Sequence, residues 1–178
     1  MGDDSGSPTA NYLRLAMTPL IGIWDLGFGV QSWSGHATEP SQMTEVNTEA
    51  WAIDAQAQAM IGKLPVGVYL SHGVADGTPV GTFRRNLFNG NPNDRKATAI
   101  VGQLGIQPGK TTVLMSYRHG DNGKALNSTD NAWMIGATYL LVQNVQLQLN
   151  HTEYSGSAYN GAPANGDRMT TLMLYASF

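Results

Sequence analysis

The sequence predicts an all-β protein, a transmembrane antiparallel up-and-down β-barrel with about eight or nine strands in this chain. Three observations support this fold class. Apolar and polar residues alternate with a period of two in one segment after another. The connections between these segments are short and long in turn. Only 13% of the 178 residues are charged and 42% are hydrophobic, as expected for a barrel with one apolar and one polar face.

The alternation is clearest in the segment Ala50–Ile61, where Trp51 and alternate alanines oppose Asp54, Gln56 and Gln58. A helix would spread these glutamines across its apolar side, so the pattern favours a strand. Nine segments have this character and are near the length of about 10 residues that a tilted strand needs to cross a bilayer. In order they are 11–18, 23–33, 50–61, 66–71, 98–106, 112–118, 133–141, 145–152 and 168–178.

Each of the other segments also has its own set of apolar alternate positions, although the contrast is weaker over 98–106. A strand places such positions on one face. In order they are Leu13, Leu15 and Met17; Trp24, Leu26, Phe28 and Val30; Val66, Val68 and Leu70; Ile100, Leu104 and Ile106; Val113, Met115 and Tyr117; Trp133, Ile135 and Tyr139; Val145, Leu147 and Leu149; and Leu172 and Leu174.

The connections fall into two classes. The short ones are expected to be tight hairpin turns, at 19–22, 62–65, 107–110 and 143–144. The long ones are polar, and several contain Asn-Gly pairs typical of loops; they cover 36–47, 76–96, 120–130 and 155–167. The strict alternation places the short turns at one edge of the barrel and the long loops at the other.

Composition excludes several classes of function. The chain has no cysteine, which excludes disulfides, thiol catalysis, Cys-based zinc sites, iron–sulfur clusters and covalent haem attachment in this chain. The net charge of −3 argues against a nucleic-acid partner. No run approaches the roughly 18 apolar residues of a transmembrane helix. The histidines have no recognisable metal-ligand spacing and no nucleophile motif is present, so we expect no metal, cofactor or enzymatic activity. The histidines are His36, His72, His119 and His151.

The polar alternate positions of a membrane barrel face its lumen. In a wide barrel they would line a hydrated channel; in a barrel of about eight strands they would fill the interior as a polar network. In the second case the buried charges must pair, and Arg14–Asp25 and Arg118–Asp54 are the candidate ion pairs. The expected lumen-lining residues are Arg14, Asp25, Gln31, Asp54, Gln56, Gln58, Ser71, Gln103, Ser116, Arg118, Gln146, Gln148 and Asn150.

Aromatic residues on the apolar face are expected at the two membrane–water interfaces, where their amphipathic rings are stabilised. The alternative is that they are core aromatics of a soluble β-sandwich or lipid-binding barrel. The expected interface aromatics are Trp24, Trp51, Tyr117, Trp133, Tyr139 and Phe178.

The segment Arg168–Phe178 alternates to its last residue and ends on an aromatic side chain. It resembles the carboxy-terminal strand of Gram-negative outer-membrane β-barrels, which ends in Phe and is recognised by the barrel assembly machinery. The resemblance is porin-like and implies a location in the bacterial outer membrane, with periplasmic short turns and extracellular long loops. It further implies contacts with outer-membrane lipids and lipopolysaccharide, and with the assembly machinery through the strand ending in Phe178.

The expected function is that of a porin-like channel, or a segment of one, that passes small hydrophilic solutes or ions. The alternative is a small closed barrel that acts as a membrane anchor or adhesion protein through its extracellular loops. We expect residues 1–178 to form one barrel domain or barrel segment, with 1–8 as a loop-like tail that does not resemble a signal peptide.

Nine strands would place residues 1–8 outside the cell, whereas bacterial barrels usually have an even strand count with both ends periplasmic. Two explanations stay open. The chain is part of a larger barrel, such as the carboxy-terminal part of a larger porin, or residues 10–18 are not a strand and eight strands remain.

Overall fold

The computed structural model describes residues 10–39, 44–78, 85–89, 95–160 and 167–176. These residues form twelve strands and one 3-10 turn, η1 (Ser157–Tyr159), and they contain no α-helix. No helix in this part of the chain has the length and apolarity needed to cross a membrane. The long strands are β1 (Ala10–Met17), β3 (Trp24–Glu39), β5 (Ala50–Ile61), β6 (Leu64–Ala75), β8 (Ala97–Ile106), β9 (Thr111–Asp121), β10 (Thr129–Val142), β11 (Val145–Ser155) and β12 (Arg168–Ala176).

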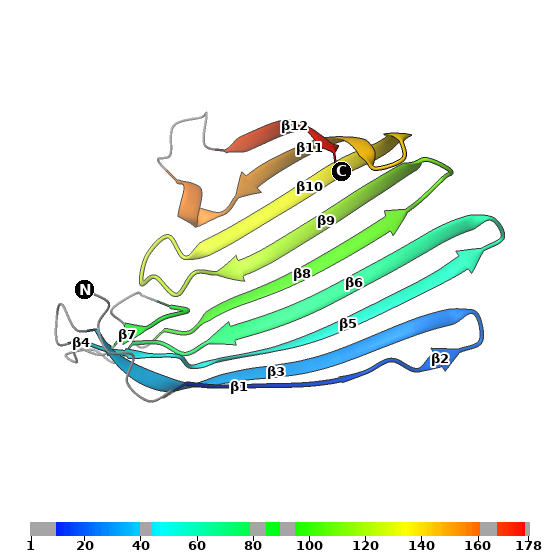
Figure 1. Ribbon diagram of the computed structural model, residues 1–178. Helices are drawn as coiled ribbons and strands as arrows, with labels where there is room; N and C mark the ends of the chain where they lie inside the picture. The colour runs from blue at the N-terminus through cyan, green and yellow to red at the C-terminus, as the bar shows by residue number, and fades with distance from the viewer. Residues whose placement is uncertain (1–9, 40–43, 79–84, 90–94, 161–166, 177–178) are drawn as a thin grey trace.

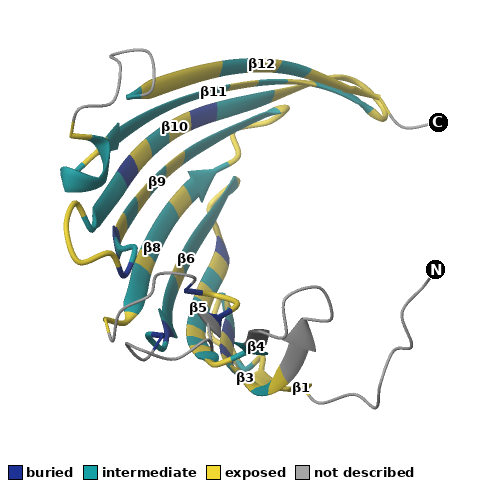
Figure 2. Ribbon diagram, turned by 90° about the vertical axis from the view of Figure 1, so that its left-hand side faces the viewer, coloured by how far each residue is buried: buried dark blue, intermediate teal, exposed yellow. Residues whose placement is uncertain are grey.

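Successive long strands pair antiparallel in the order β1-β3-β5-β6-β8-β9-β10-β11-β12. The short β2 (Leu20–Ile21) follows β1 and pairs with the start of β3. At the other end of β3, β4 (Thr44–Asn47) pairs antiparallel with its last residues and parallel with β7 (Arg85–Asn86). The sheet is curved into a trough, with β1 and β12 at its two edges (Figures 1 and 2). The predicted all-β up-and-down topology is confirmed, but β1 and β12 do not pair and the described sheet is open.

The first strand is real: all eight residues of β1 pair with β3, from Ala10 opposite Gly35 to Met17 opposite Phe28. The alternative in which residues 10–18 are not a strand is therefore wrong. The sheet has nine long strands and not eight.

Short and long connections lie at opposite ends of the strands (Figure 1). Each of the four short turns contains one residue with positive φ: Gly22 (62°), Gly62 (65°), Gly109 (65°) and Asn144 (64°). This left-handed conformation is available to Gly, and next to Asn, at little cost. The expected loop at 36–47 is partly wrong, because His36 pairs with Asn47 and Ala37 with Val46, and these pairs continue the β3 hairpin.

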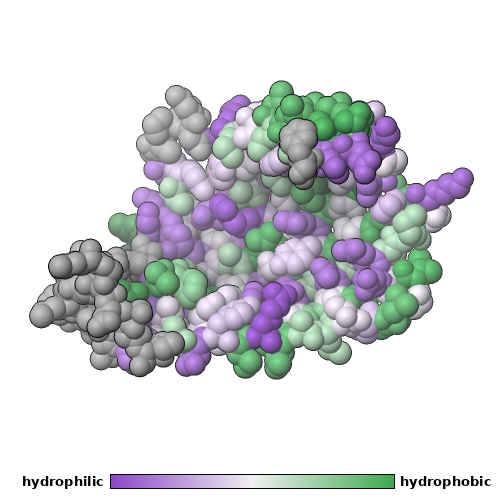
Figure 3. Space-filling view, in the orientation of Figure 1, coloured by the Kyte–Doolittle hydropathy of each residue, from purple (hydrophilic) through white to green (hydrophobic). Residues whose placement is uncertain are grey.

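The two faces of the sheet differ sharply in polarity. Large apolar side chains are exposed on the convex face, whereas the concave face is more enclosed and mainly hydrophilic where it is seen in Figure 3. In β12, Leu172 and Leu174 are 67% and 65% exposed, while Thr171 and Met173 on the other face are half-buried. One row of paired convex residues is apolar throughout: Trp24, Ala59, Val66, Ile106, Val113, Ala137, Leu149 and Leu172.

The described residues contain almost no hydrophobic core. Their buried apolar side chains are the alanines Ala59, Ala75 and Ala132. A soluble domain buries an apolar face of each sheet against another layer, and here the convex face is covered by no second layer of described residues (Figure 2).

Candidate functional site

The register places all of the expected lumen-lining residues on the concave face. Arg14 lies opposite Gln31 at one edge of the sheet, Gln103 lies opposite Ser116 near its middle, and Gln148 pairs with Met173 of the other edge strand. The remaining members follow by the alternation of the same strands. These residues come from seven of the nine long strands, with none from β10 or β12, and they share one face of the sheet.

Two glycines of β3 make room on this surface for polar side chains of β5. A Cβ added at Gly29 would lie 2.5 Å from Asp54 Oδ2, and one added at Gly27 would lie 2.7 Å from Gln56 Cγ. The Asp54 carboxylate can therefore lie over β3 and approach β1. Arg14 Nη2 is 3.5 Å from Asp54 Oδ1.

The expected ion pair Arg14–Asp25 is wrong. Arg14 is in register with Gln31, and Asp25 lies six residues farther along β3, about 20 Å away at roughly 3.3 Å per residue. Asp54 is two strands away, but the missing side chain at Gly29 brings it within reach. Sequence alternation predicts the face of each charge and does not predict which charges meet.

The expected pair Arg118–Asp54 is also wrong, because β6 and β8 lie between their strands. Arg118 Nη2 instead donates to Asp130 Oδ1 at 2.5 Å, and Tyr159 Oη donates to the same oxygen at 2.7 Å. Burial, and then the Asp130 carboxylate, raise the pKa of the Tyr159 hydroxyl above its usual 10.0. Sequence analysis missed Asp130 because it assigned residues 120–130 to a loop, whereas β10 begins at Thr129.

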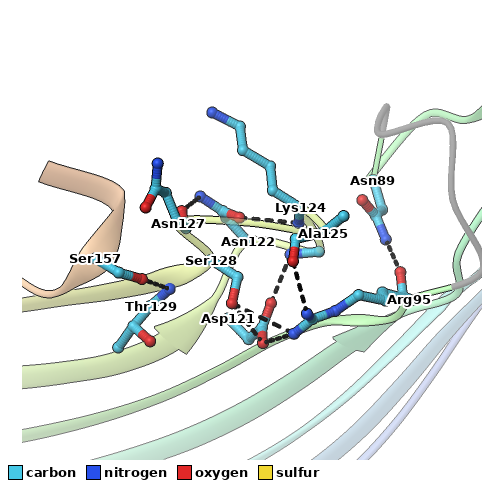
Figure 4. Close-up of polar contacts among 11 residues, drawn as sticks. Asn89, Arg95, Asp121, Asn122, Lys124, Ala125, Asn127, Ser128, Thr129 and Ser157 are labelled. Carbon is cyan, nitrogen blue, oxygen red and sulfur yellow. Dashed lines mark hydrogen bonds and ion pairs between the residues drawn. The ribbon is translucent and has the colours of Figure 1, made fainter. Parts of the chain in front are cut away.

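The long connections are tied to each other by a second charged cluster (Figure 4). Arg95 donates to Asp121 Oδ2 at 2.7 Å and to Ser128 Oγ and Ala125 O at 3.3 Å each. Lys96 Nζ is 2.6 Å from Asp76 Oδ1. Arg95 and Lys96 thus each have a carboxylate partner, which reduces the positive charge that these two side chains present to solvent.

Buried amides hold the connection between β6 and β8 against the sheet. Asn86 and Asn89 are only 2% and 3% exposed. The Asn86 side-chain amide donates to Glu49 O at 2.7 Å and to Asp76 O at 2.8 Å, and its oxygen accepts a bond from Glu49 N at 3.3 Å. Sequence analysis treated this segment only as a polar loop, and its composition gives no sign of a buried amide network.

Two of the hollows on the concave side lie at opposite ends of the strands. One of about 360 Å³ lies near the long connections, between Trp33 and Phe88 on one side and Arg118 and Asp130 on the other. The other, of about 470 Å³, lies near the short turns and is lined in part by Asp25 and Gln58.

The expected interface aromatics that the structure describes all lie on the convex face, and Phe178 lies outside the described residues. Trp24 is at the short-turn end, opposite Ala59, and Trp51 lies eight residues before Ala59 at the other end. This separation is about 26 Å along the strand, or about 20 Å along a barrel axis at a tilt of about 40°.

Each of the three histidines on the convex face contacts a different neighbour. His72 packs edge-on against Trp51 with ring centroids 5.4 Å apart, and His151 against Trp133 at 5.7 Å. His119 Nδ1 is 2.7 Å from Asn131 Oδ1. Within the part of the chain that the structure describes, no three His, Cys, Asp or Glu side chains are placed to hold a metal ion.

Comparison with known proteins gives no match for this chain: no family model, curated protein or solved structure is similar to it.

Proposed function

We propose that this chain forms the wall, or part of the wall, of a β-barrel channel in the bacterial outer membrane, through which small hydrophilic solutes or ions pass. The observation that carries the proposal is the segregation of the two faces. The outside of the trough is apolar and exposed, and the inside is polar, which is the reverse of a soluble barrel.

The convex face suits contact with lipid. Its alternate positions carry no charged residue in the Trp24 row or in the next row toward the long connections, which contains Ile135, His151 and Thr170. Glu153 and Arg168 are paired with each other in the following row, beside Trp133 on the last two strands. The distance of about 20 to 26 Å between the levels of Trp24 and Trp51 compares with an apolar band of about 25 Å in such barrels. We assign lipopolysaccharide to the long-connection end, and the barrel assembly machinery to the strand β12 that leads to Phe178.

The concave face suits the passage of small hydrophilic solutes with weak charge selection. Most of the expected lumen-lining residues are neutral, with glutamine the commonest, and Arg14 and Arg118 are paired with Asp54 and Asp130. Asp25 has no ion-pair partner among the described residues and lines the hollow near the short turns. We therefore expect a modest preference for cations, since an unpaired carboxylate on a pore wall attracts them.

Thiol accessibility tests the assignment of the two faces, and the absence of native cysteine makes each engineered site unique. We expect Gln103→Cys on the concave face to react with a charged, water-soluble thiol reagent in vesicles. Its neighbour Leu104→Cys, on the convex face, should be protected and should instead be quenched by a lipid-borne probe. Labelling of Leu104→Cys by the charged reagent as fast as Gln103→Cys would contradict the proposal.

Conductance tests the transport step itself. Planar bilayers containing the chain together with any strands it needs for closure should show discrete current steps, and Asp25→Asn should lower the cation preference without abolishing conduction. A chain that inserts with the predicted labelling pattern but carries no current would favour the anchoring or adhesion alternative.

A further inference from the structure

The two edges of the sheet run in the same direction. β1 begins at the end that carries the long connections and leads into the short turn at Gly22. β12 also begins after a long connection, and its last residue, Ala176, pairs with Val145, the first residue after the short turn at Asn144. An antiparallel chain of nine strands necessarily has parallel outer strands.

Both edges are unpaired within the described residues, and both have an apolar convex side. Leu15 of β1 and Leu172 of β12 are 63% and 67% exposed. If the convex face lies in lipid, the amide and carbonyl groups along both edges have no water to bind, so an open sheet is not a viable end state in the membrane. This step rests on the proposed function.

Three arrangements would satisfy the edges. Direct pairing of β1 with β12 would join two parallel strands and so create one parallel seam. A second copy of the chain inserted in the same direction would create two parallel seams, because its own β1 and β12 would run in the same direction as those of the first copy. Antiparallel pairing on both edges requires an odd number of intervening strands, and outer-membrane barrels of the up-and-down type use antiparallel neighbours. In Figure 2 the two edges lie apart on the open side of the trough, which leaves room for such strands.

We infer that the barrel is completed by an odd number of transmembrane strands from outside these 178 residues, antiparallel to both β1 and β12. Their side chains alternate apolar toward lipid and polar toward the trough, because the edge strands on both sides do so. The channel wall is then shared, and this sheet supplies nine of an even number of strands.

The first experiment measures the gap between the edges in the full chain. Spin labels at Leu15→Cys and Leu172→Cys, diluted with unlabelled chain in vesicles or detergent, should lie more than about 20 Å apart, whereas a β1–β12 seam would bring them within about 15 Å. The pair Leu149→Cys and Leu172→Cys is the matched control, because these residues are direct cross-strand partners and report that the sheet has formed. A short distance between the edge labels would overturn the inference in favour of self-closure. A short distance between separately labelled chains would overturn it in favour of a second copy.

The second experiment tests the parity by supplying strands. One extended chain carries a copy of residues 24–155 before residue 1, which adds seven strands and makes every seam antiparallel. A matched chain carries a copy of residues 10–155, which adds the same strands and β1, and so leaves one parallel seam. The first should give a heat-modifiable, protease-resistant, conducting barrel and the second should not. Equal closure of both chains, or closure of neither, would overturn the inference.

Vesicle flotation separates this inference from the proposed function. If the chain does not insert into membranes, the proposed function fails. If it inserts and its edges meet each other or a second copy, only the inference about external strands fails.

Discussion

A single arginine on the convex face tests which surface meets lipid. Leu70 lies on β6, in register with Ala55, midway between the levels of Trp24 and Trp51, and it is 52% exposed. Arginine at the middle of a lipid-facing strand costs about 2–4 kcal/mol, which corresponds to a roughly 30- to 700-fold shift in the unfolding equilibrium. In water an arginine at an exposed site would change stability by no more than about 0.5 kcal/mol.

The matched control is Ser71→Arg, one residue along the same strand. Its side chain enters the polar concave face opposite Asp54, so we expect a change within about 0.5 kcal/mol. Unfolding from phospholipid vesicles in urea, followed by tryptophan fluorescence, gives both free energies. Both variants have the same two edge strands, so any effect of unpaired edges on the free energy of unfolding is the same in each and cancels in the comparison. The reasoning is refuted if Leu70→Arg is as stable as the unsubstituted chain while Ser71→Arg is strongly destabilised.

Three further predictions concern the polar contacts. Gly29→Ala should cost about 1–3 kcal/mol in urea unfolding, because its Cβ would lie 2.5 Å from Asp54 Oδ2, and adding Asp54→Ala should relieve much of this cost. The raised pKa of Tyr159 means that its contribution to stability is complete below its unfolded value of 10.0 and is lost as the pH rises through the folded value. The protection factors of the η1 amides, which are corrected for the intrinsic exchange rate at each pH, should fall only above that range in the native chain and should already be low at neutral pH in Tyr159→Phe. Asn86→Ala removes the side-chain donor to Glu49 O and leaves Asp76 O with the Asn89 amide at 3.3 Å, so it should cost about 1–3 kcal/mol and speed proteolysis of the 76–96 connection.

The predictable part of the fold is the part encoded by local alternation. Because side chains of a strand point to opposite faces in turn, the positions of Gln56, Gln103 and Gln148 were enough to place them on one face before any pairing was known. The turn residues were informative for the same reason: Gly62 and Asn144 adopt the positive φ that tight hairpins require.

The contacts that sequence analysis missed depend on more than one strand at once. Arg14 meets Asp54 only because Gly29 of the intervening strand has no side chain, and Arg118 meets Asp130 because β10 begins earlier than its apolar pattern suggests. Asn86 is buried only because residues 49 and 76 supply carbonyl groups on either side of it. No local periodicity contains this information.

The scarcity of buried apolar side chains links the two proposals. Burial of apolar surface is the main driving force for folding in water, yet the buried apolar residues among those described are the alanines Ala59, Ala75 and Ala132. Much of the free energy that holds this sheet must therefore come from whatever covers its convex face, and an exposed surface that is largely apolar is suited to lipid. The same lipid makes unpaired strand edges untenable. On the proposed function the convex face lies in a bilayer, so the edges must also be paired there, and since β1 and β12 are parallel, antiparallel pairing of both requires an odd number of additional strands.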